Sequence, residues 1–179
     1  MKGFLTDSLI IANPAISDNP KFSNIAGKAV YIVEHSEKGA IGISLNKSFS
    51  MPFDEISQKL PILANIAPDE LLSNKILEGG LITNDTPWVL GRNTQPYDKQ
   101  SRTEILTLNF SEQAFKDNVA EHMAICGIGT FGWGKGQLEN ELANRLWHHF
   151  TTSQEALLNI PFNDEFIGCI QLLLAMKYE

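Results

Sequence analysis

The chain has 179 residues, of which 43% are hydrophobic and 20% charged, proportions typical of a folded globular protein rather than a disordered one. Its 21 acidic residues outnumber 14 basic ones, and the net charge of −7 disfavours direct DNA binding, which needs a basic face. No stretch approaches the ~18 apolar residues that cross a membrane. The N-terminal residues also lack the pattern of a secretion signal, so we expect a cytoplasmic protein.

The first half of the chain predicts short strands separated by turns. An apolar run at residues 9–12 stops at Asn13-Pro14, because proline restricts the residue before it and removes a donor. Residues 29–33 are apolar throughout, which predicts a strand covered on both faces. Residues 40–46 alternate in polarity, and the short linker before them predicts a hairpin. A helix is expected at residues 50–60.

The second half mixes strands and helices. Strands are expected at residues 75–78, 88–90 and 104–108, and a helix at residues 111–119. The apolar run at residues 122–129 predicts a further strand.

Residues 127–136 hold five glycines and stand between that apolar run and a segment with helical spacing. We interpret them as a tight strand-to-helix turn in which glycines take positive φ and make room for Trp133. The alternative is a phosphate-binding or dinucleotide-binding loop, although the order Gly-x-x-Gly-x-Gly differs from the usual fingerprint. The following helix is expected over residues 136–150, with a stripe formed by Leu138, Leu142 and Leu146.

A last helix is expected at residues 165–176. Strands and helices follow one another without a regular alternation, and neither a repeat nor a linker divides the chain. This pattern favours an α+β fold in a single domain, residues 1–179. The two cysteines, Cys126 and Cys169, lie among apolar residues and are expected to be buried thiols.

Five segments, taken in chain order, resemble the YqgE/AlgH family of bacterial proteins. They are Leu-Ile-Ile-Ala-Asn-Pro-Ala-Ile-Ser-Asp at 9–18, Val-Tyr-Ile-Val-Glu-His at 30–35, Gly-Ala-Ile-Gly-Ile-Ser-Leu-Asn-Lys at 39–47, Glu-Gly-Gly-Leu-Ile at 78–82 and Gly-Trp-Gly-Lys-Gly-Gln-Leu-Glu at 132–139. The resemblance implies a branched, mostly antiparallel sheet that closes into a partial barrel with surrounding helices. One branch of the family is named for regulation of alginate synthesis, which implies a regulatory role. No reaction or cofactor comes with the resemblance.

Each side chain that could react is better explained by a structural role than by a catalytic or metal-binding role. Glu34-His35 are neighbours on a strand and should point to opposite faces of the sheet. His148-His149 would diverge by about 100° on a helix, a poor spacing for shared metal ligation, so no metal site is expected. Glu141 is expected to pair with Arg145 one helical turn later.

These observations predict a binding or regulatory protein, with regulation related to transcription through a protein or small-ligand partner. The alternative is an enzyme or nucleotide-binding protein that uses the glycine-rich residues 127–136. No catalytic residue and no cofactor are assigned. A candidate binding groove, if the fold brings its turns together, consists of Glu34, His35, Asn46, Gly79, Gly80, Gly132, Trp133, Gly134 and Gln137.

Overall fold

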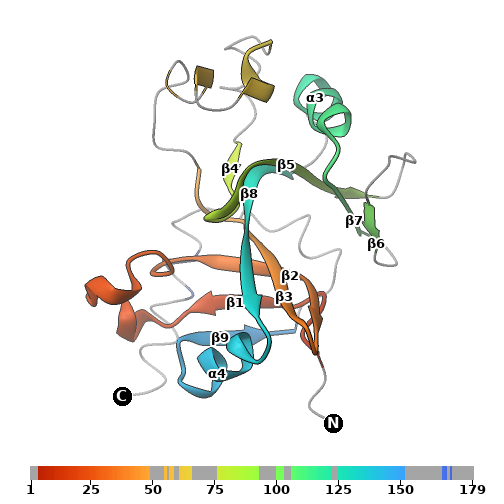
Figure 1. Cartoon of the computed structure of the whole chain (residues 1–179). Helices are drawn as coiled ribbons and strands as arrows, with labels where there is room; N and C mark the ends of the chain where they lie inside the picture. The colour runs from red at the N-terminus through yellow and green to blue at the C-terminus, as the bar shows by residue number, and fades with distance from the viewer. Residues whose placement is uncertain are drawn as a thin grey trace. The chain divides into compact units, whose positions relative to one another are not determined.

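The computed structural model describes residues 4–48, 55, 57–58, 61–65, 76–92, 100–102, 106–121, 125–151, 167–168 and 170. The chain divides into two compact units. The first unit consists of Met1–Lys47 and Phe131–Glu179, and the second is the continuous segment Ser48–Thr130. One strand, β8 (Ile125–Gly134), supplies residues to both units (Figure 1).

The first unit is built on an antiparallel sheet. Its strands are β1 (Leu9–Ala12), β2 (Ala29–Ser36), β3 (Gly39–Ser44), the end of β8 and β9 (Trp147–Phe150). They pair in the order β9-β1-β2-β3-β8. The predicted hairpin is confirmed, since β2 pairs with β3 next to it in the chain, and residues 29–33 are buried as an all-apolar run requires.

Two short 3-10 helices connect β1 to β2. They are η1 (Pro14–Ile16) and η2 (Pro20–Phe22), and each has a proline in its first turn. Asn13 caps the first, since its Oδ1 accepts the N–H of Ala15 (3.0 Å), and Asn19 caps the second in the same way. The predicted turn after residue 12 is therefore a pair of capped helical turns.

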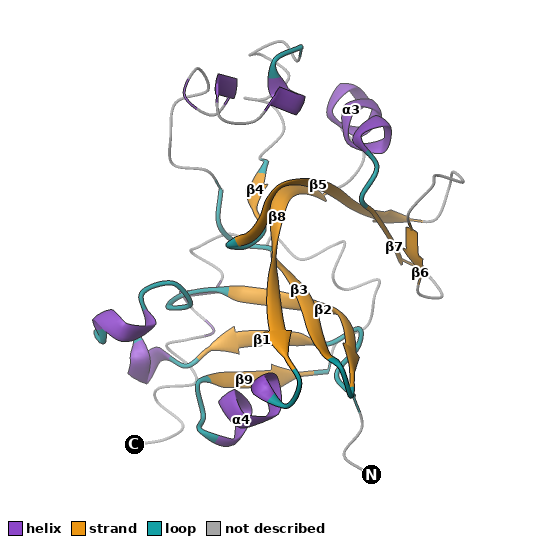
Figure 2. Cartoon of the chain, in the orientation of Figure 1, coloured by secondary structure: helices purple, strands orange, loops and turns teal. Residues whose placement is uncertain are grey.

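The core of the first unit lies between its sheet and helix α4 (Gln137–Ala143) (Figure 2). Leu138 of that helix is fully buried, and Leu142 and Leu146 pack against the same cluster. The buried cluster consists of Ile10, Ala12, Ile16, Val30, Ile32, Ala40, Phe131, Trp133, Leu138 and Trp147.

Helix α4 is much shorter than the predicted helix over residues 136–150, which is wrong beyond residue 143. The helix is capped at Asn144, and Arg145 has φ +58°, a left-handed conformation that a helix cannot continue through. Residues 147–150 then form strand β9, which pairs with β1 in the register Ile10↔His149. The leucine stripe continues past the helix because Leu146, in the loop, also contacts the core.

The second unit contains β4 (Leu77–Glu78), β5 (Ile82–Arg92), β6 (Gln100–Arg102), β7 (Leu106–Asn109) and the first part of β8. The order β6-β7-β5-β8 is antiparallel, and β4 pairs with β8 in parallel. This unit also contains η3 (Pro61–Leu63) and α3 (Glu112–Glu121). The predicted strands at 75–78, 88–90 and 104–108 and the helix at 111–119 correspond to β4, β5, β7 and α3.

The fold is therefore mostly antiparallel and branched, as expected, because β8 pairs with β3, β4 and β5. The described pairings do not close the sheet into a barrel, so the expected partial barrel and surrounding helices fit only loosely. The predicted helices at 50–60 and 165–176 lie mainly outside the described residues, although residues 55, 57–58, 167–168 and 170 are helical. Within the described part of the chain, neither α3 nor α4 has the length and apolar character that crossing a bilayer requires.

Candidate functional site

The nine predicted groove residues are divided between the two units. Gly79 and Gly80 belong to the second unit. The first unit holds Glu34, His35, Asn46, Gly132, Trp133, Gly134 and Gln137. A single groove formed by all nine stays a prediction.

Four side chains at the junction of β8, α4 and β9 form a cluster of hydrogen bonds around one carboxylate. Trp133 Nε1–H and Trp147 Nε1–H both donate to Glu141 Oε2, over 2.9 and 2.7 Å. Gln137 Nε2–H donates to Glu141 Oε1 (2.9 Å), and Gln137 Oε1 accepts the N–H of Gly134 (3.0 Å). We call Trp133, Gln137, Glu141 and Trp147 the indole–carboxylate cluster.

This cluster replaces the predicted pair between Glu141 and Arg145. Arg145 lies beyond the end of α4 in a left-handed conformation, so the two residues do not share the regular helical spacing on which that pair depended. The signal that sequence reasoning missed is the presence of two tryptophans, whose indole N–H groups need acceptors when buried, on either side of a glutamate.

The aromatic rings of the same region pack against one another. Trp133 stacks on Phe131 with ring centroids 5.9 Å apart and meets Trp147 edge to face at 6.1 Å. N–H groups that donate to a carboxylate form short, charge-assisted bonds, and here three of them fix one side chain. The indole–carboxylate cluster is therefore built to hold β8, α4 and β9 together rather than to react.

His35 is buried and has a partner at each ring nitrogen. The N–H of Leu5 donates to Nδ1 (3.0 Å), so in this arrangement Nδ1 carries no proton and Nε2 does. Nε2–H then donates to Oε1 of Glu139 on α4 (3.0 Å). Since Glu34 is exposed and His35 is buried, the two residues face opposite sides of the sheet, as predicted. His35 is thus not placed as a free base.

Asn46 is buried and joins two segments of backbone. Its Oδ1 accepts the N–H of Ala29 (2.7 Å), and its Nδ2–H donates to the carbonyl of Gly27 (2.9 Å). This amide therefore orients the entry into β2 and the exit from β3, which is a structural role.

The glycine-rich residues 127–134 lie in strand β8, so their interpretation as a strand-to-helix turn is wrong for this part. Only Gly136, at φ +72°, occupies the connection to α4. Glycine is required at 127 because a Cβ there would overlap the ring of Trp88 and lie 2.6 Å from the carbonyl of Leu77. Trp88 Nε1–H in turn donates to the carbonyl of Gly129 (2.8 Å). In this unit the tryptophan that the glycines accommodate is Trp88, not Trp133.

Glycine is required at residue 79 for the same reason. A Cβ at this position would overlap the Trp88 indole and the carbonyl of Gly129, and the Gly79 N–H donates to the carbonyl of Ile128 (2.8 Å). Gly80 is buried beside it. The Gly79-Gly80 pair therefore permits close backbone packing within the second unit.

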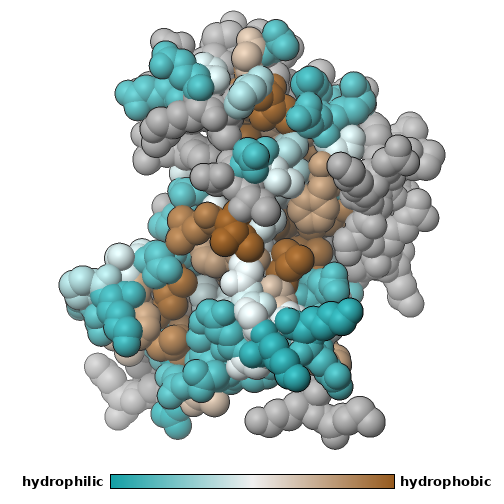
Figure 3. Space-filling view, in the orientation of Figure 1, coloured by the Kyte–Doolittle hydropathy of each residue, from teal (hydrophilic) through white to brown (hydrophobic). Residues whose placement is uncertain are grey.

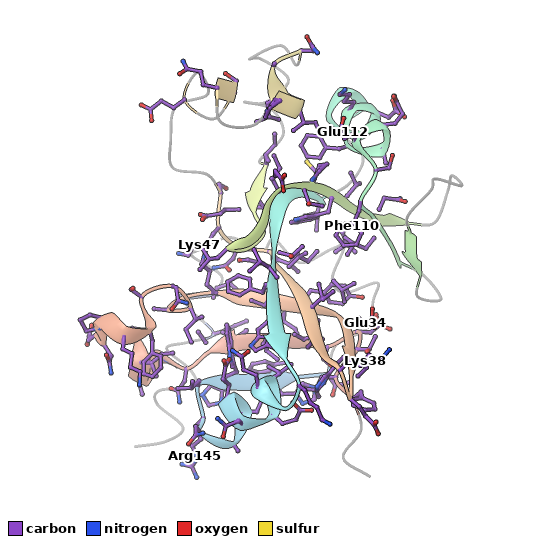
Figure 4. The ribbon with its side chains drawn as sticks, viewed as in Figure 1. Glu34, Lys38, Lys47, Phe110, Glu112 and Arg145 are labelled. Carbon is purple, nitrogen blue, oxygen red and sulfur yellow. The ribbon has the colours of Figure 1, made fainter. Side chains whose placement is uncertain are left out.

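Two of the predicted groove residues, Glu34 and Gly132, lie beside Ile41 on the exposed side of the first sheet. Glu34, Ile41 and Gly132 are aligned across β2, β3 and β8, and all three are exposed. We call them the Ile41 face. Figure 4 shows Glu34 and Lys38 on the hairpin that β2 and β3 form. Because Gly132 has no side chain, the backbone of β8 is accessible beside Ile41, which is 42% exposed.

Exposed large apolar side chains are few in the described residues. Figure 3 shows both apolar and polar residues on the visible face of the chain. The large apolar residues that are exposed are Phe4, Ile41, Leu81 and Ile82. Ile41 differs from the others in standing at the middle of three paired strands in the first unit.

Other reactive groups do not gather in the described part of the chain. There, no three His, Cys, Asp or Glu side chains lie as metal ligands would. His148 and His149 are on strand β9 rather than on a helix, and His149 Nε2 lies 3.1 Å from Ser8 Oγ. Cys126 is buried, as expected, and Cys169 lies outside the described residues.

Comparison with known proteins places these features in a wider group. The model of a family described as AlgH-like matches residues 9–175. The chain is 27% identical to a UPF0301 protein of Ralstonia pickettii, covering 94% of this chain and 88% of the relative. It is 29% identical to a UPF0301 protein of Shewanella woodyi, covering 90% and 87%.

Solved structures also resemble the fold. The solution structure of the AlgH protein from Pseudomonas aeruginosa gives a TM-score of 0.73 at 25% identity, covering 95% of this chain and 88% of that one. The crystal structure of a Corynebacterium diphtheriae protein gives a TM-score of 0.58 at 17% identity, covering 84% and 77%, and shares the fold alone.

Proposed function

We propose that this chain, which belongs to the AlgH-like family, is a regulatory binding protein of the cytoplasm that acts through a protein partner. The family resemblance supports a regulatory role, including one related to transcription. The chemistry of the first unit supports binding over catalysis, because polar groups that could react are engaged in internal hydrogen bonds. His35 and Asn46 each use both of their polar side-chain atoms in this way.

The observation that carries the proposal is the Ile41 face. A large apolar side chain that is 42% exposed, with a glycine on one side and a carboxylate on the other, provides an apolar anchor with a polar margin. Small-molecule sites are concave, whereas this surface is a sheet face. A protein partner therefore suits it better than a metabolite.

The alternative, an enzyme or nucleotide-binding protein that uses residues 127–136, is less well supported. Phosphate loops present successive backbone N–H groups at the start of a helix. Here residues 127–134 pair within a sheet, and the N–H of Gly134 is already bound to Gln137. Nucleotide binding is therefore the second candidate function.

The direct test compares Ile41→Asp with Leu81→Asp, which makes the same change at an exposed apolar residue of the other unit. Tagged wild-type and variant proteins would be used to capture partners from the native bacterium, with quantitative mass spectrometry as readout. We expect a protein that is retained by wild type and Leu81→Asp but lost with Ile41→Asp. Equal recovery with both variants would contradict the role of the Ile41 face.

A thermal-stabilisation screen separates the two candidate functions. A ligand that binds the native state raises the melting temperature by mass action. If a nucleotide stabilises wild type and Ile41→Asp equally, the nucleotide-binding alternative is favoured. If no nucleotide does so while the partner captured above stabilises wild type only, the binding function proposed here is supported.

We also propose that residues 1–179 behave as one domain, although they form two compact units. The support is β8, a single strand with core residues in both units, Ile128 in the second and Trp133 in the first. Urea unfolding followed by circular dichroism and by fluorescence of single-tryptophan variants, retaining Trp88 or Trp133, should give coincident transitions. Two separated transitions would show independent domains.

A further inference from the structure

The segment that precedes β1 is held against the sheet by His35. The N–H of Leu5 donates to His35 Nδ1 (3.0 Å), and the ring of Phe4 meets the imidazole edge to face at 5.3 Å. The next residue binds the backbone of His35, since Thr6 Oγ1 accepts the His35 N–H (2.9 Å) and donates to its carbonyl (3.4 Å). We call Phe4 and Leu5 the N-terminal latch, with Thr6 as its hinge.

The hydrogen bond from Leu5 exists only while the imidazole is neutral. A backbone N–H can donate to Nδ1 only if this atom has a free lone pair, and a protonated histidine has a donor at both nitrogens. Protonation would set two N–H groups against one another inside a buried site, where His35 is 5% exposed. The hydrogen bond must then break.

We propose that His35 is a pH-operated switch that closes the N-terminal latch when neutral and releases it when protonated. Glu139 makes protonation possible in this buried position, because its carboxylate lies 3.0 Å from Nε2 and can neutralise an imidazolium. Protonation therefore strengthens the bond to α4 and removes the bond to Leu5. The ring changes which of its two partners it favours.

The surroundings of the ring leave Glu139 as the charged group that determines its response. In the sheet, the register neighbour of His35 on β3 is Ala40, and the next residue on β8 is Trp133, neither of which is charged. From the N-terminal side, Phe4 and Leu5 contribute a ring and a backbone amide. Among the described residues, Glu139 is the ionisable side chain within hydrogen-bond distance of the ring.

The conformation that follows the hinge limits how far the release extends. Asp7 has φ +65°, a left-handed conformation that aspartate adopts more readily than most residues other than glycine. Its own N–H donates to the carbonyl of Ile32 (2.9 Å), and its carboxylate accepts from Tyr31 (2.6 Å). These bonds do not involve the imidazole, so they persist and keep the chain attached from residue 7 onward.

Amide hydrogen exchange, measured by nuclear magnetic resonance between about pH 8 and pH 5, tests the switch in the full-length chain. Three amides serve as reporters. Leu5 should lose protection as His35 titrates, and so should Ser8, whose N–H donates to the Leu5 carbonyl (3.1 Å). Asp7 should not, and it corrects for the intrinsic pH dependence of exchange. We expect the protection of Leu5 relative to Asp7 to fall by at least ~10-fold, the loss of about one hydrogen bond.

Two variants control for other causes. In His35→Asn, the amide oxygen takes the place of Nδ1 as acceptor but cannot be protonated in this range, so Leu5 should stay protected throughout. In Glu139→Gln, the neutral amide still accepts from Nε2–H but stabilises an imidazolium less, so the midpoint should move to lower pH. Glu139 is 41% exposed, so this second variant provides a test even if His35→Asn does not fold.

Constant protection of Leu5 while the imidazole resonances of His35 titrate would overturn the proposal. So would a loss of protection in His35→Asn at the same pH as in wild type, because the titrating group would then lie elsewhere. An unchanged midpoint in Glu139→Gln would likewise refute the assignment of His35 as the switch.

Discussion

Replacing Glu141 should reveal how strongly the indole–carboxylate cluster stabilises the first unit. In Glu141→Ala, the buried indole N–H groups of Trp133 and Trp147 both lose their acceptor. A buried donor without a partner costs about 1–3 kcal/mol. The amide of Gln137 is exposed and can bond to water instead, so it adds little. We therefore expect a loss of roughly 3–4 kcal/mol, a large part of the ~5–15 kcal/mol that stabilises a typical domain.

Glu141→Gln separates the geometry of the acceptor from its charge. The glutamine oxygen can take the position of Oε2 and accept from both indoles, while its amide group faces the donor of Gln137. The variant loses one bond and the charge assistance, so we expect a cost of about 1–2 kcal/mol. Glu37→Gln makes the same chemical change at an exposed residue and should cost less than ~0.5 kcal/mol.

The measurement is urea unfolding followed by circular dichroism, with tryptophan fluorescence as a second probe of the ring environment. A double-mutant cycle adds Trp147→Phe to Glu141→Ala, and the tryptophan change should cost less in the alanine background because its N–H has already lost its acceptor. The reasoning fails if Glu141→Ala is no more destabilising than Glu37→Gln, or if alanine and glutamine at residue 141 cost the same.

Three further predictions concern glycine packing and pH. Gly127→Ala should cost several times more free energy of unfolding than Gly134→Ala in urea titrations, because a Cβ at 127 overlaps Trp88 whereas the nearest atom at 134 is 3.9 Å away; equal costs would contradict this explanation. Burial, and then the hydrogen bond to a carboxylate, raise the pKa of Tyr31 far above its usual value of 10.0. The phenol should therefore stay protonated in tyrosinate absorbance titrations of the native state, and its contribution to stability, complete below pH 10, should decline above it. Burial lowers the pKa of His148 below its usual 6.5, so its contribution to stability is complete above that value and is lost as the pH falls below it. The stability difference between about pH 7.5 and pH 5.5 should be smaller in His148→Gln than in wild type, and an identical difference would contradict this assignment.

The elements that could be predicted from sequence are those whose signal is local. Residues 29–33 are apolar without interruption, and the polar linker that follows is short, so the β2–β3 hairpin could be located and its burial anticipated. The capped turn at Asn13-Pro14 is equally local, because an asparagine side chain binds backbone two residues later.

The glycine-rich strand could not be recognised, because the reason for its glycines lies elsewhere in the chain. In isolation, residues 127–134 have the composition of a turn. Their extended conformation depends on Trp88, 39 positions before Gly127, whose ring occupies the space that a side chain at 127 would need. Such packing leaves no periodic signal in the strand itself.

The end of α4 has no local signal for a similar reason. Leu138, Leu142 and Leu146 follow helical spacing, and all three do face the same core, but Leu146 reaches it from a loop. The left-handed turn at Arg145 ends the helix, and residues 147–150 then pair with β1. Trp133 and Gln137 both belong to the predicted groove, and the carboxylate that binds both of them, Glu141, is one that helical spacing pairs with Arg145 instead.

In the sequence, the second unit is inserted between the two segments of the first, and this order affects synthesis on the ribosome. Ser48–Thr130 is translated as one continuous piece, whereas the first unit is interrupted by it. When residue 130 has emerged, strands β1, β2 and β3 are complete, but the strands that flank them, β9 and the end of β8, have not yet been made. Until about twenty more residues have been synthesised, the sheet of β1, β2 and β3 has two unpaired edges. Unpaired strand edges are surfaces through which nascent chains aggregate. We therefore expect nascent chains stalled on the ribosome between residues 130 and 150 to depend on chaperones more than shorter or longer chains do.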